Sequence, residues 1–167
     1  ADLRRITRLY EAHGYYQARI LDETVTDTGK GSVRIKVKLT EGSPATLSSL
    51  RLNGLDALPD QRARFEAKSP LKLGITFLED DWARAKSLLL ENLHEAGYAE
   101  AKVVGEAQVD LDGPKVDATL TADPGLRYTF GPIYAPVVGR VVPSKLIIDV
   151  AEAELVRGQV FSESALA

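Results

Sequence analysis

The chain repeats one residue pattern at a fixed distance, and this repeat limits its possible folds more than any other feature. Six residues recur 83 positions later in the chain, and two more, Gly74 and Phe77, recur 84 positions later as Gly158 and Phe161. A period of this length is too long for a solenoid repeat and suits a small domain used in tandem. The residue pairs separated by 83 positions are Gly14 and Gly97, Tyr15 and Tyr98, Ala18 and Ala101, Val33 and Val116, Gly42 and Gly125, and Thr46 and Thr129.

Composition narrows the class of protein. Of the 167 residues, 44% are hydrophobic and 27% are charged, which is ordinary for a globular domain. The net charge of −3 disfavours non-specific binding to the phosphate backbone of nucleic acid. Cysteine is absent, which excludes disulfides, thiolate metal sites and thiol catalysis. The sequence has no signal peptide and starts at Ala1, so we expect a mature or excised fragment.

The first copy of the pattern predicts a helix followed by a hairpin. Residues 2–13 carry apolar side chains at helical spacing, and Gly14 ends the segment. Strands are expected at 17–26 and 32–40, joined by a polar turn. In the later strand apolar and basic side chains alternate, which predicts one buried face and one solvated face. The expected buried residues are Val33, Ile35, Val37 and Leu39, and the expected solvated ones are Arg34, Lys36 and Lys38.

The second copy predicts a long helix over residues 78–96. Thr76 and Glu79 have the spacing of a capping box, in which a hydroxyl and a carboxylate satisfy free amides of the first helical turn. One apolar stripe runs along the helix and predicts its buried face. The residues of this stripe are Trp82, Ala85, Leu89, Leu93 and Ala96.

The remaining elements of the second copy complete a mixed α+β unit. A strand is expected at 46–52, with Leu50 and Leu52 inward, and a short helix at 60–68 anchored by Phe65. Two more strands are expected at about 100–111 and 114–122, joined by Asp112-Gly113. Their inward residues are predicted to be Val103, Gly105, Ala107, Val109 and Leu111, then Val116, Ala118, Leu120 and Ala122.

A third, incomplete copy follows Asp123. A strand is predicted at 127–134, with Tyr128 and Phe130 inward, and a helix at 144–155. The unit is therefore strand, helix, helix, strand, strand. The expected division is a partial domain at 1–42, a complete one at 43–124, and a second partial one at 125–167.

No candidate catalytic, cofactor-binding or metal-ligating residue stands out. His13 and His94 lie near predicted helix ends, where an imidazole commonly meets free carbonyls or solvent. A zinc site would need several converging ligands. Residues 28–32 read TGKGS, but they lack the glycine spacing of a phosphate loop and precede a strand. We therefore predict no enzyme activity and no cofactor.

The basic stripe of Arg34, Lys36 and Lys38 has two interpretations. It is either a solvated strand face or a surface for an acidic partner. The sequence leaves both open.

The repeated order, with these residues, resembles the POTRA (polypeptide-transport-associated) domain. The resemblance rests on the helix that ends in Gly-Tyr at Gly97 and again at Gly14, the alanine that follows, and the hairpin that closes on Gly125 or Gly42. The run from Gly125 to Ile133 looks like a junction between consecutive POTRA domains. Residues 76–133 look most like TamA-type proteins, and next like BamA-like proteins.

The resemblance implies a fold and a function. Each domain would have the order β-α-α-β-β, with two helices packed on a three-stranded mixed sheet. The location would be the periplasmic face of the bacterial outer membrane, next to a carboxy-terminal β-barrel that this fragment lacks. The partners would be unfolded outer-membrane or secreted clients and a periplasmic or inner-membrane assembly partner, with no nucleic acid.

Two other classes of protein compete with this interpretation. One is a cytosolic α+β ligand-binding or enzymatic domain, although no nucleophile–base pair, metal cluster or phosphate loop favours it. The other is an RNA-binding domain, which conflicts with the acidic balance. The resemblance favours a non-enzymatic scaffold that guides clients by β-augmentation, in which an extended peptide pairs with a sheet edge.

The segment at 101–111 is the predicted edge strand and client-pairing site. The resemblance implies that the last strand of the unit is central and that the strand before it lies at the edge. Charged residues on this segment fit an edge whether or not it binds a client, because charge protects edges from indiscriminate pairing. The residues predicted to pair with a client strand are Ala101, Lys102, Val103, Val104, Gly105 and Glu106.

Overall fold

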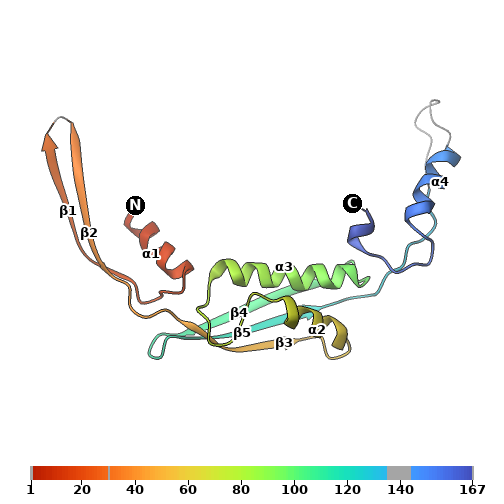
Figure 1. The fold of residues 1–167 in the computed structure, drawn as a ribbon, viewed down its shortest axis with the longest axis horizontal. Coiled ribbons are helices and arrows are strands. Elements are labelled where there is room, and N and C mark those ends of the chain that lie inside the picture. The colour runs from red at the N-terminus through yellow and green to blue at the C-terminus, as the bar shows by residue number, and fades with distance from the viewer. Residues whose placement is uncertain (1, 30, 135–143, 167) are drawn as a thin grey trace. The chain divides into compact units, whose positions relative to one another are not determined.

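The computed structural model describes residues 2–29, 31–134 and 144–166 (Figure 1). Its elements are α1 (Asp2–Ala12), β1 (Arg19–Gly29), β2 (Ser32–Thr40), β3 (Thr46–Asn53), α2 (Pro59–Lys68), α3 (Glu79–Glu95), β4 (Lys102–Asp110), β5 (Lys115–Asp123), α4 (Ser144–Glu154) and the 3-10 turn η1 (Glu163–Leu166). Among the described helices, none is long and apolar enough to cross a membrane.

The chain forms two compact units, and several elements of the second copy pass through both. One unit contains residues 1–51, 69–85 and 105–120. The other contains residues 52–68, 86–104 and 121–167. The sequence predicted domain boundaries at 42/43 and 124/125 from the repeated order of elements. These boundaries differ from those of the two compact units, and they stay a prediction.

The three-stranded sheet has the order β3-β5-β4. The Thr46 amide donates to the Pro114 carbonyl at 3.0 Å, and the Ser48 hydroxyl donates to the Val116 carbonyl at 3.1 Å. Because residue numbers rise together along both strands, β3 runs parallel to β5, and the sheet is mixed. The central position predicted for the last strand of the unit is therefore confirmed. Its inward residues are all buried: Val116, Ala118, Leu120 and Ala122.

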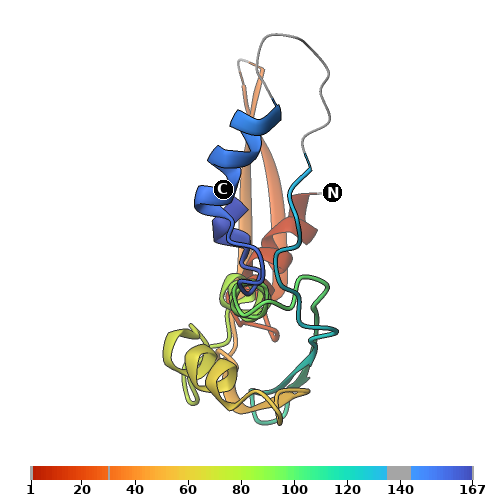
Figure 2. The same cartoon turned by 90° about the vertical axis from the view of Figure 1, so that its right-hand side faces the viewer.

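Two helices cover one face of this sheet, as the views in Figures 1 and 2 both show. In α2, Phe65 is fully buried, as its predicted role as an anchor requires. In α3, Leu89 and Leu93 are fully buried, and Ala85 is buried with them. The predicted α+β fold class, with helices on a mixed sheet, is confirmed.

The hairpin of β1 and β2 is antiparallel, with Val25 opposite Ile35 and Glu23 opposite Val37. The prediction of a buried face on β2 is wrong. Val33 is 61% exposed and Ile35 is 64% exposed, because this end of the described hairpin pairs only with itself. Val37 and Leu39, toward the other end of the strand, are half-buried. The alternation is present, but it marks an apolar face rather than a core.

Several smaller predictions also need correction. Leu111 is 48% exposed and Ala107 is exposed, since the end of the hairpin reaches beyond the buried part of the sheet. In β3 the more deeply buried residues are Leu47 and Leu52, while Leu50 is half-buried.

Residues 127–134 do not form the predicted strand. Among these residues Thr129 alone forms a β-bridge, to Val160, because a strand needs a neighbour along its length and the described residues supply one bridge. Phe130 still packs, with its ring centroid 5.6 Å from that of Phe161. The predicted helix at 144–155 is present as α4.

The elements themselves repeat at the spacing found in the sequence. Strand β2 moved by 83 positions coincides with β5 at both ends, and the start of α3 moved by 84 positions falls on the start of η1. We call the segment 2–40 the first repeat, 46–123 the second repeat and 126–166 the third repeat. Among the residues that the structure describes, the second repeat alone shows the full order of elements.

Candidate functional site

Strand β4 is an edge of the three-stranded sheet, as predicted, since within the described part of the chain β5 is its one partner. The side chains of Lys102, Val104 and Glu106 are exposed, with Val104 at 64%. Val103 and Gly105 are half-buried. Ala101 is buried and precedes the strand, so among the predicted pairing residues its side chain is the one that faces away from solvent.

The opposite edge is partly occupied. At the start of β3, the Leu47 amide donates to the Ile75 carbonyl at 2.9 Å, and the Gly74 amide donates to the Leu47 carbonyl at 2.8 Å. The segment before α3 therefore fills the outer side of β3, and a strand added from outside would find those groups already paired. Strand β4 is the more accessible edge.

Gly105 brings the middle of β4 close to the start of α3. A Cβ atom on Gly105 would lie 2.5 Å from the Trp82 ring and 3.0 Å from Leu120. Trp82 also contacts Phe77, with ring centroids 5.7 Å apart. The strand is therefore supported from one face by an aromatic pair while its outer edge stays open.

The predicted partner surface lies on β2. Arg34, Lys36 and Lys38 are all exposed, on the face opposite Val33 and Ile35. Their cross-strand neighbours on β1 are Thr26, Thr24 and Asp22 respectively. Of the three basic residues, Lys38 alone lies opposite a carboxylate, that of Asp22, so the stripe keeps a net positive charge.

Each unit also contains a junction in which a helix end meets the segment that follows the hairpin. In the first unit, the Ala45 amide donates to the Gly14 carbonyl at 2.8 Å, and the Phe77 amide donates to the Ala45 carbonyl at 2.9 Å. Gly14 has φ of +88°, and a Cβ there would lie 2.9 Å from the Phe77 carbonyl oxygen. Glycine is therefore required by both conformation and space.

The second unit repeats this junction with equivalent residues. The Tyr128 amide donates to the Gly97 carbonyl at 2.7 Å, and the Phe161 amide donates to the Tyr128 carbonyl at 3.0 Å. Gly97 has φ of +99°, and a Cβ there would lie 2.7 Å from Val160. The same hydrogen bonds form at both junctions, and each junction includes the glycine of a Gly-Tyr pair. The repeated Gly-Tyr pair is therefore the sequence feature that predicts this arrangement.

The side chains of the two junctions differ. In the first unit Arg8 forms an ion pair with Glu79, and this contact raises the pKa of Arg8 above its usual value, through the hydrogen bond first and the charge second. The predicted capping box is wrong, because Thr76 bridges Thr46 and the helix begins three residues later, at Glu79. The sequence did not predict the ion pair of Arg8 and Glu79, since these residues are 71 positions apart.

In the second unit the equivalent acidic residue, Glu163, lies 3.0 Å from Nδ1 of His94. Glu95 accepts hydrogen bonds from the Ser164 hydroxyl at 2.7 Å and from the Ser164 amide at 2.8 Å. The hydroxyl first, and then the amide, lower the pKa of Glu95 below its usual value. His13 instead meets the Leu9 carbonyl, 2.7 Å away, as expected near a helix end.

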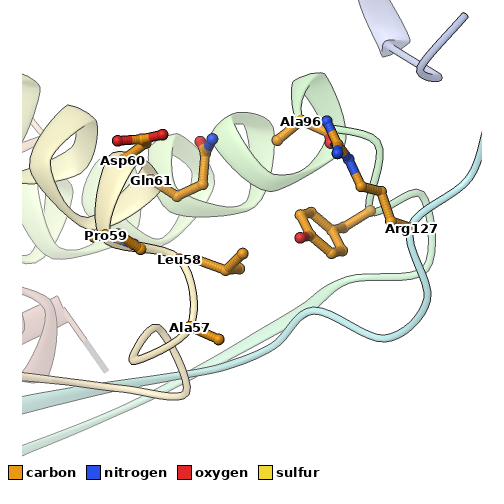
Figure 3. Close-up of a pocket in the computed structure, with 8 residues that line it drawn as sticks. Ala57, Leu58, Pro59, Asp60, Gln61, Ala96 and Arg127 are labelled. Atoms are coloured by element: carbon orange, nitrogen blue, oxygen red, sulfur yellow. The ribbon is translucent and has the colours of Figure 1, made fainter.

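A pocket of about 170 Å³ opens beside the start of α2 (Figure 3). Gln61 and Arg127 line it from opposite sides. Gln61 Oε1 is buried and has no hydrogen-bond partner among the described residues, while the Arg127 Nε donates to the Ala96 carbonyl at 3.0 Å. A pocket with these polar groups has room for water, and it presents no nucleophile–base pair.

The comparisons with known proteins agree with this architecture. Residues 1–42 match the family described as POTRA, surface antigen variable number repeat. The crystal structure of Haemophilus influenzae BamA POTRA3-5 is similar over 99% of this chain, with a TM-score of 0.56 and 24% identity. The chain has the POTRA fold. The open edge at β4 is therefore an edge of a POTRA sheet.

A curated relative gives the same indication from sequence. Over 127 residues the chain is 24% identical to the outer membrane protein assembly factor BamA of Neisseria meningitidis serogroup B (strain ATCC BAA-335 / MC58). The match covers 75% of this chain but 16% of that protein, and the Haemophilus match covers 64% of that crystallised chain. The chain thus spans a minor part of the curated relative.

Proposed function

We propose that the chain is a non-enzymatic POTRA scaffold at the periplasmic face of the outer membrane. It would dock an assembly partner and guide outer-membrane or secreted client polypeptides. The POTRA fold and the likeness to an outer membrane protein assembly factor support this function. The resemblance of residues 76–133 to TamA-type proteins remains part of the proposal, beside the likeness to BamA.

We propose β-augmentation at β4 as the physical mechanism. The observation that carries it is the position of β4 at the free edge of the sheet, while the start of β3 is occupied. An extended peptide would pair its main chain with the outward amides and carbonyls of β4. Exposed side chains next to the edge, Val104 among them, would contact alternate client residues.

Site-specific crosslinking tests the mechanism, and the absence of native cysteine makes the labelling specific. Single cysteines replacing Lys102, Val104 or Glu106 would carry a photocrosslinker and meet an extended outer-membrane client peptide. Crosslinks should concentrate on these positions. The matched control is Thr121→Cys, an exposed position on the central strand β5. Equal labelling of the control would contradict pairing at the edge.

Proline substitution separates edge pairing from simple proximity. Of two adjacent variants, Val103→Pro and Val104→Pro, one removes an amide that faces β5 and the other removes an amide that faces outward. The outward variant should fold normally and lose client crosslinks, while the inward one should lose stability. Normal client binding by both folded variants would defeat the mechanism.

The stripe of Arg34, Lys36 and Lys38 is the proposed surface for an acidic assembly partner. All three residues are exposed on one face of β2. Replacing the three by glutamate should abolish a salt-sensitive interaction with that partner while leaving crosslinks at β4 unchanged. An unchanged interaction would assign the stripe to a solvated face.

A further inference from the structure

A pocket of about 250 Å³ lies beside β4, and the residues that line it all belong to the first unit. Strand β4 contributes two small or medium side chains, and three aromatic rings lie around them. These residues are Ala107 and Val109 of β4, with Tyr16, Phe77 and Trp82. An apolar cavity of about 150 Å³ can hold a benzene ring. The pocket therefore has room for one aromatic side chain.

The pocket exists because β4 carries small residues where Trp82 approaches the strand. A Cβ atom on Gly105 would lie 2.5 Å from the Trp82 ring, so this ring lies directly against the strand. Ala107 is the next residue on the same face, and its short side chain is exposed. The ring of Trp82 thus fills the face of the strand at Gly105 and leaves it open at Ala107.

Three aromatic rings give the pocket its chemical character. Phe77 is buried and its ring centroid lies 5.7 Å from that of Trp82. Tyr16 is half-buried, and this burial first, then the charge of Glu79, raise its pKa above the usual value. Aromatic rings favour offset or edge-to-face contact with a further ring. The lining therefore suits an aromatic side chain better than an aliphatic one.

Charged side chains bound the pocket on the side of α1. Arg8 of α1 forms an ion pair with Glu79 at the start of α3, and Glu11 of α1 also lines the pocket. The apolar lining therefore ends at charged groups. This arrangement favours one apolar side chain in the pocket over a longer apolar segment.

The open edge of β4 determines what can reach the pocket. In a strand added to this edge, the residue opposite Ala107 would lie on the same face as Ala107, toward the pocket. Its sequence neighbours would point to the other face, where Lys102, Glu106 and Gln108 are exposed. Strands of outer-membrane barrels alternate between apolar and polar side chains and carry aromatic residues at the membrane interfaces. Such a strand has the alternation that the two faces require.

We propose that this pocket takes one aromatic side chain of the client strand that pairs with β4. The inference rests on the proposed pairing at β4 and adds a residue requirement to it. The selected segment of a client is an extended one, in which an aromatic residue is flanked by polar residues. The main chain of β4 supplies the pairing, and the pocket supplies the selection.

Trp82 is the single tryptophan and lines the pocket, so its fluorescence reports occupancy directly. The probes are three extended outer-membrane client peptides without tryptophan, which carry phenylalanine, leucine or alanine at one central position. The phenylalanine peptide should shift the Trp82 emission and bind about 10-fold more tightly than the alanine peptide. The leucine peptide should bind with an affinity between the two.

Ala107→Leu tests the pocket from the side of the protein. The larger side chain should fill the pocket and leave the main chain of the edge unchanged. The three peptides should then bind equally, while crosslinks from Val104→Cys remain. Gln108→Leu is the matched control, because it adds the same side chain at an exposed neighbouring position on the opposite face, and it should keep the preference for phenylalanine. Urea unfolding followed by Trp82 fluorescence checks that both variants fold.

The outcomes separate this inference from the pairing on which it rests. Crosslinks at β4 together with equal binding of the phenylalanine and leucine peptides, or of all three, would overturn the aromatic pocket and leave the pairing intact. A preference for phenylalanine that survives Ala107→Leu would do the same. Absence of crosslinks at β4 with every peptide would overturn the pairing, and the pocket's role with it.

Discussion

Strands β2 and β5 carry the same alternating pattern and differ almost completely in burial. Val116 and Ala118 on β5 are 0% and 1% exposed. The residues 83 positions earlier, Val33 and Ile35 on β2, are 61% and 64% exposed. Both strands belong to antiparallel hairpins that follow a helix and a Gly-Tyr pair. The sequence pattern is therefore common to both, and the difference comes from what lies around each strand.

The comparison shows that alternation defines a face, whereas neighbouring elements decide whether that face becomes a core. Strand β5 is central in its sheet, and two helices cover the sheet. Strand β2 has one neighbouring strand. Burial of apolar surface is the main source of stability, so equivalent substitutions in the two repeats should have very different effects. The single tryptophan, Trp82, lies in the second repeat and reports its unfolding.

The largest difference is expected between Leu89→Ala and Ile6→Ala, which are equivalent positions on α3 and α1. Leu89 is fully buried, so its truncation should lower the free energy of unfolding by about 2–5 kcal/mol. Ile6 is half-buried in a repeat without the covering elements, and Ile6→Ala should leave the Trp82 transition in urea nearly unchanged. Equal shifts of the midpoint would remove the distinction between the two repeats.

A second pair, Val116→Thr and Val33→Thr, tests the strands themselves. The new hydroxyl at position 116 would be buried without an assigned partner, at a cost of about 1–3 kcal/mol in free energy of unfolding. At position 33 the hydroxyl would be solvated, so the change should stay within about 0.5 kcal/mol. Denaturation followed by Trp82 fluorescence and by circular dichroism measures both. A costly Val33→Thr would show that this face is covered in solution.

The architecture could be predicted from the sequence wherever local pattern and tertiary surroundings agree. The periodicity of α3, the alternation of β5 and the anchor Phe65 each correspond to buried residues. The edge position of β4 was also predictable, through the resemblance rather than through alternation. The client-pairing role of β4 stays a prediction, because the structure contains no client.

The failures share a physical cause, which is that the missing information was not local. The exposed face of β2 and the absent strand at 127–134 depend on neighbours that the pattern does not contain. The ion pair of Arg8 and Glu79 joins residues 71 positions apart, and the sequence suggested a local cap for Glu79 instead. Helix-start chemistry competes with long-range pairing for the same carboxylate, and the pattern cannot decide between them.

A third pair, Gly105→Ala and Asp22→Ala, tests how closely each hairpin is packed. A Cβ on Gly105 would lie 2.5 Å from the Trp82 ring, so overpacking should cost about 1–3 kcal/mol, toward the lower end because the half-buried ring can move. Asp22, its equivalent on β1, is exposed and should tolerate alanine. Urea titration gives the stability, and a shifted Trp82 emission maximum would locate the strain. A neutral Gly105→Ala would show that β4 stands further from α3.

The smallest effect is expected from acid at the junction of the second unit, where Glu95 stands in place of Ala12 of the first repeat. The Ser164 hydroxyl and then its amide lower the pKa of the Glu95 carboxyl, so folding favours its charged form. This contribution is present above the ordinary carboxyl value of 4.5 and is lost as the pH falls through the lowered pKa. The NMR shift of the Ser164 amide should titrate in that range. Glu95→Gln keeps a neutral acceptor and should remove the titration of the Ser164 amide. The Ala45 amide of the first unit donates to the Gly14 carbonyl rather than to a carboxylate, so its NMR shift serves as the reference. An unchanged Ser164 titration in Glu95→Gln would assign the effect to another carboxyl group.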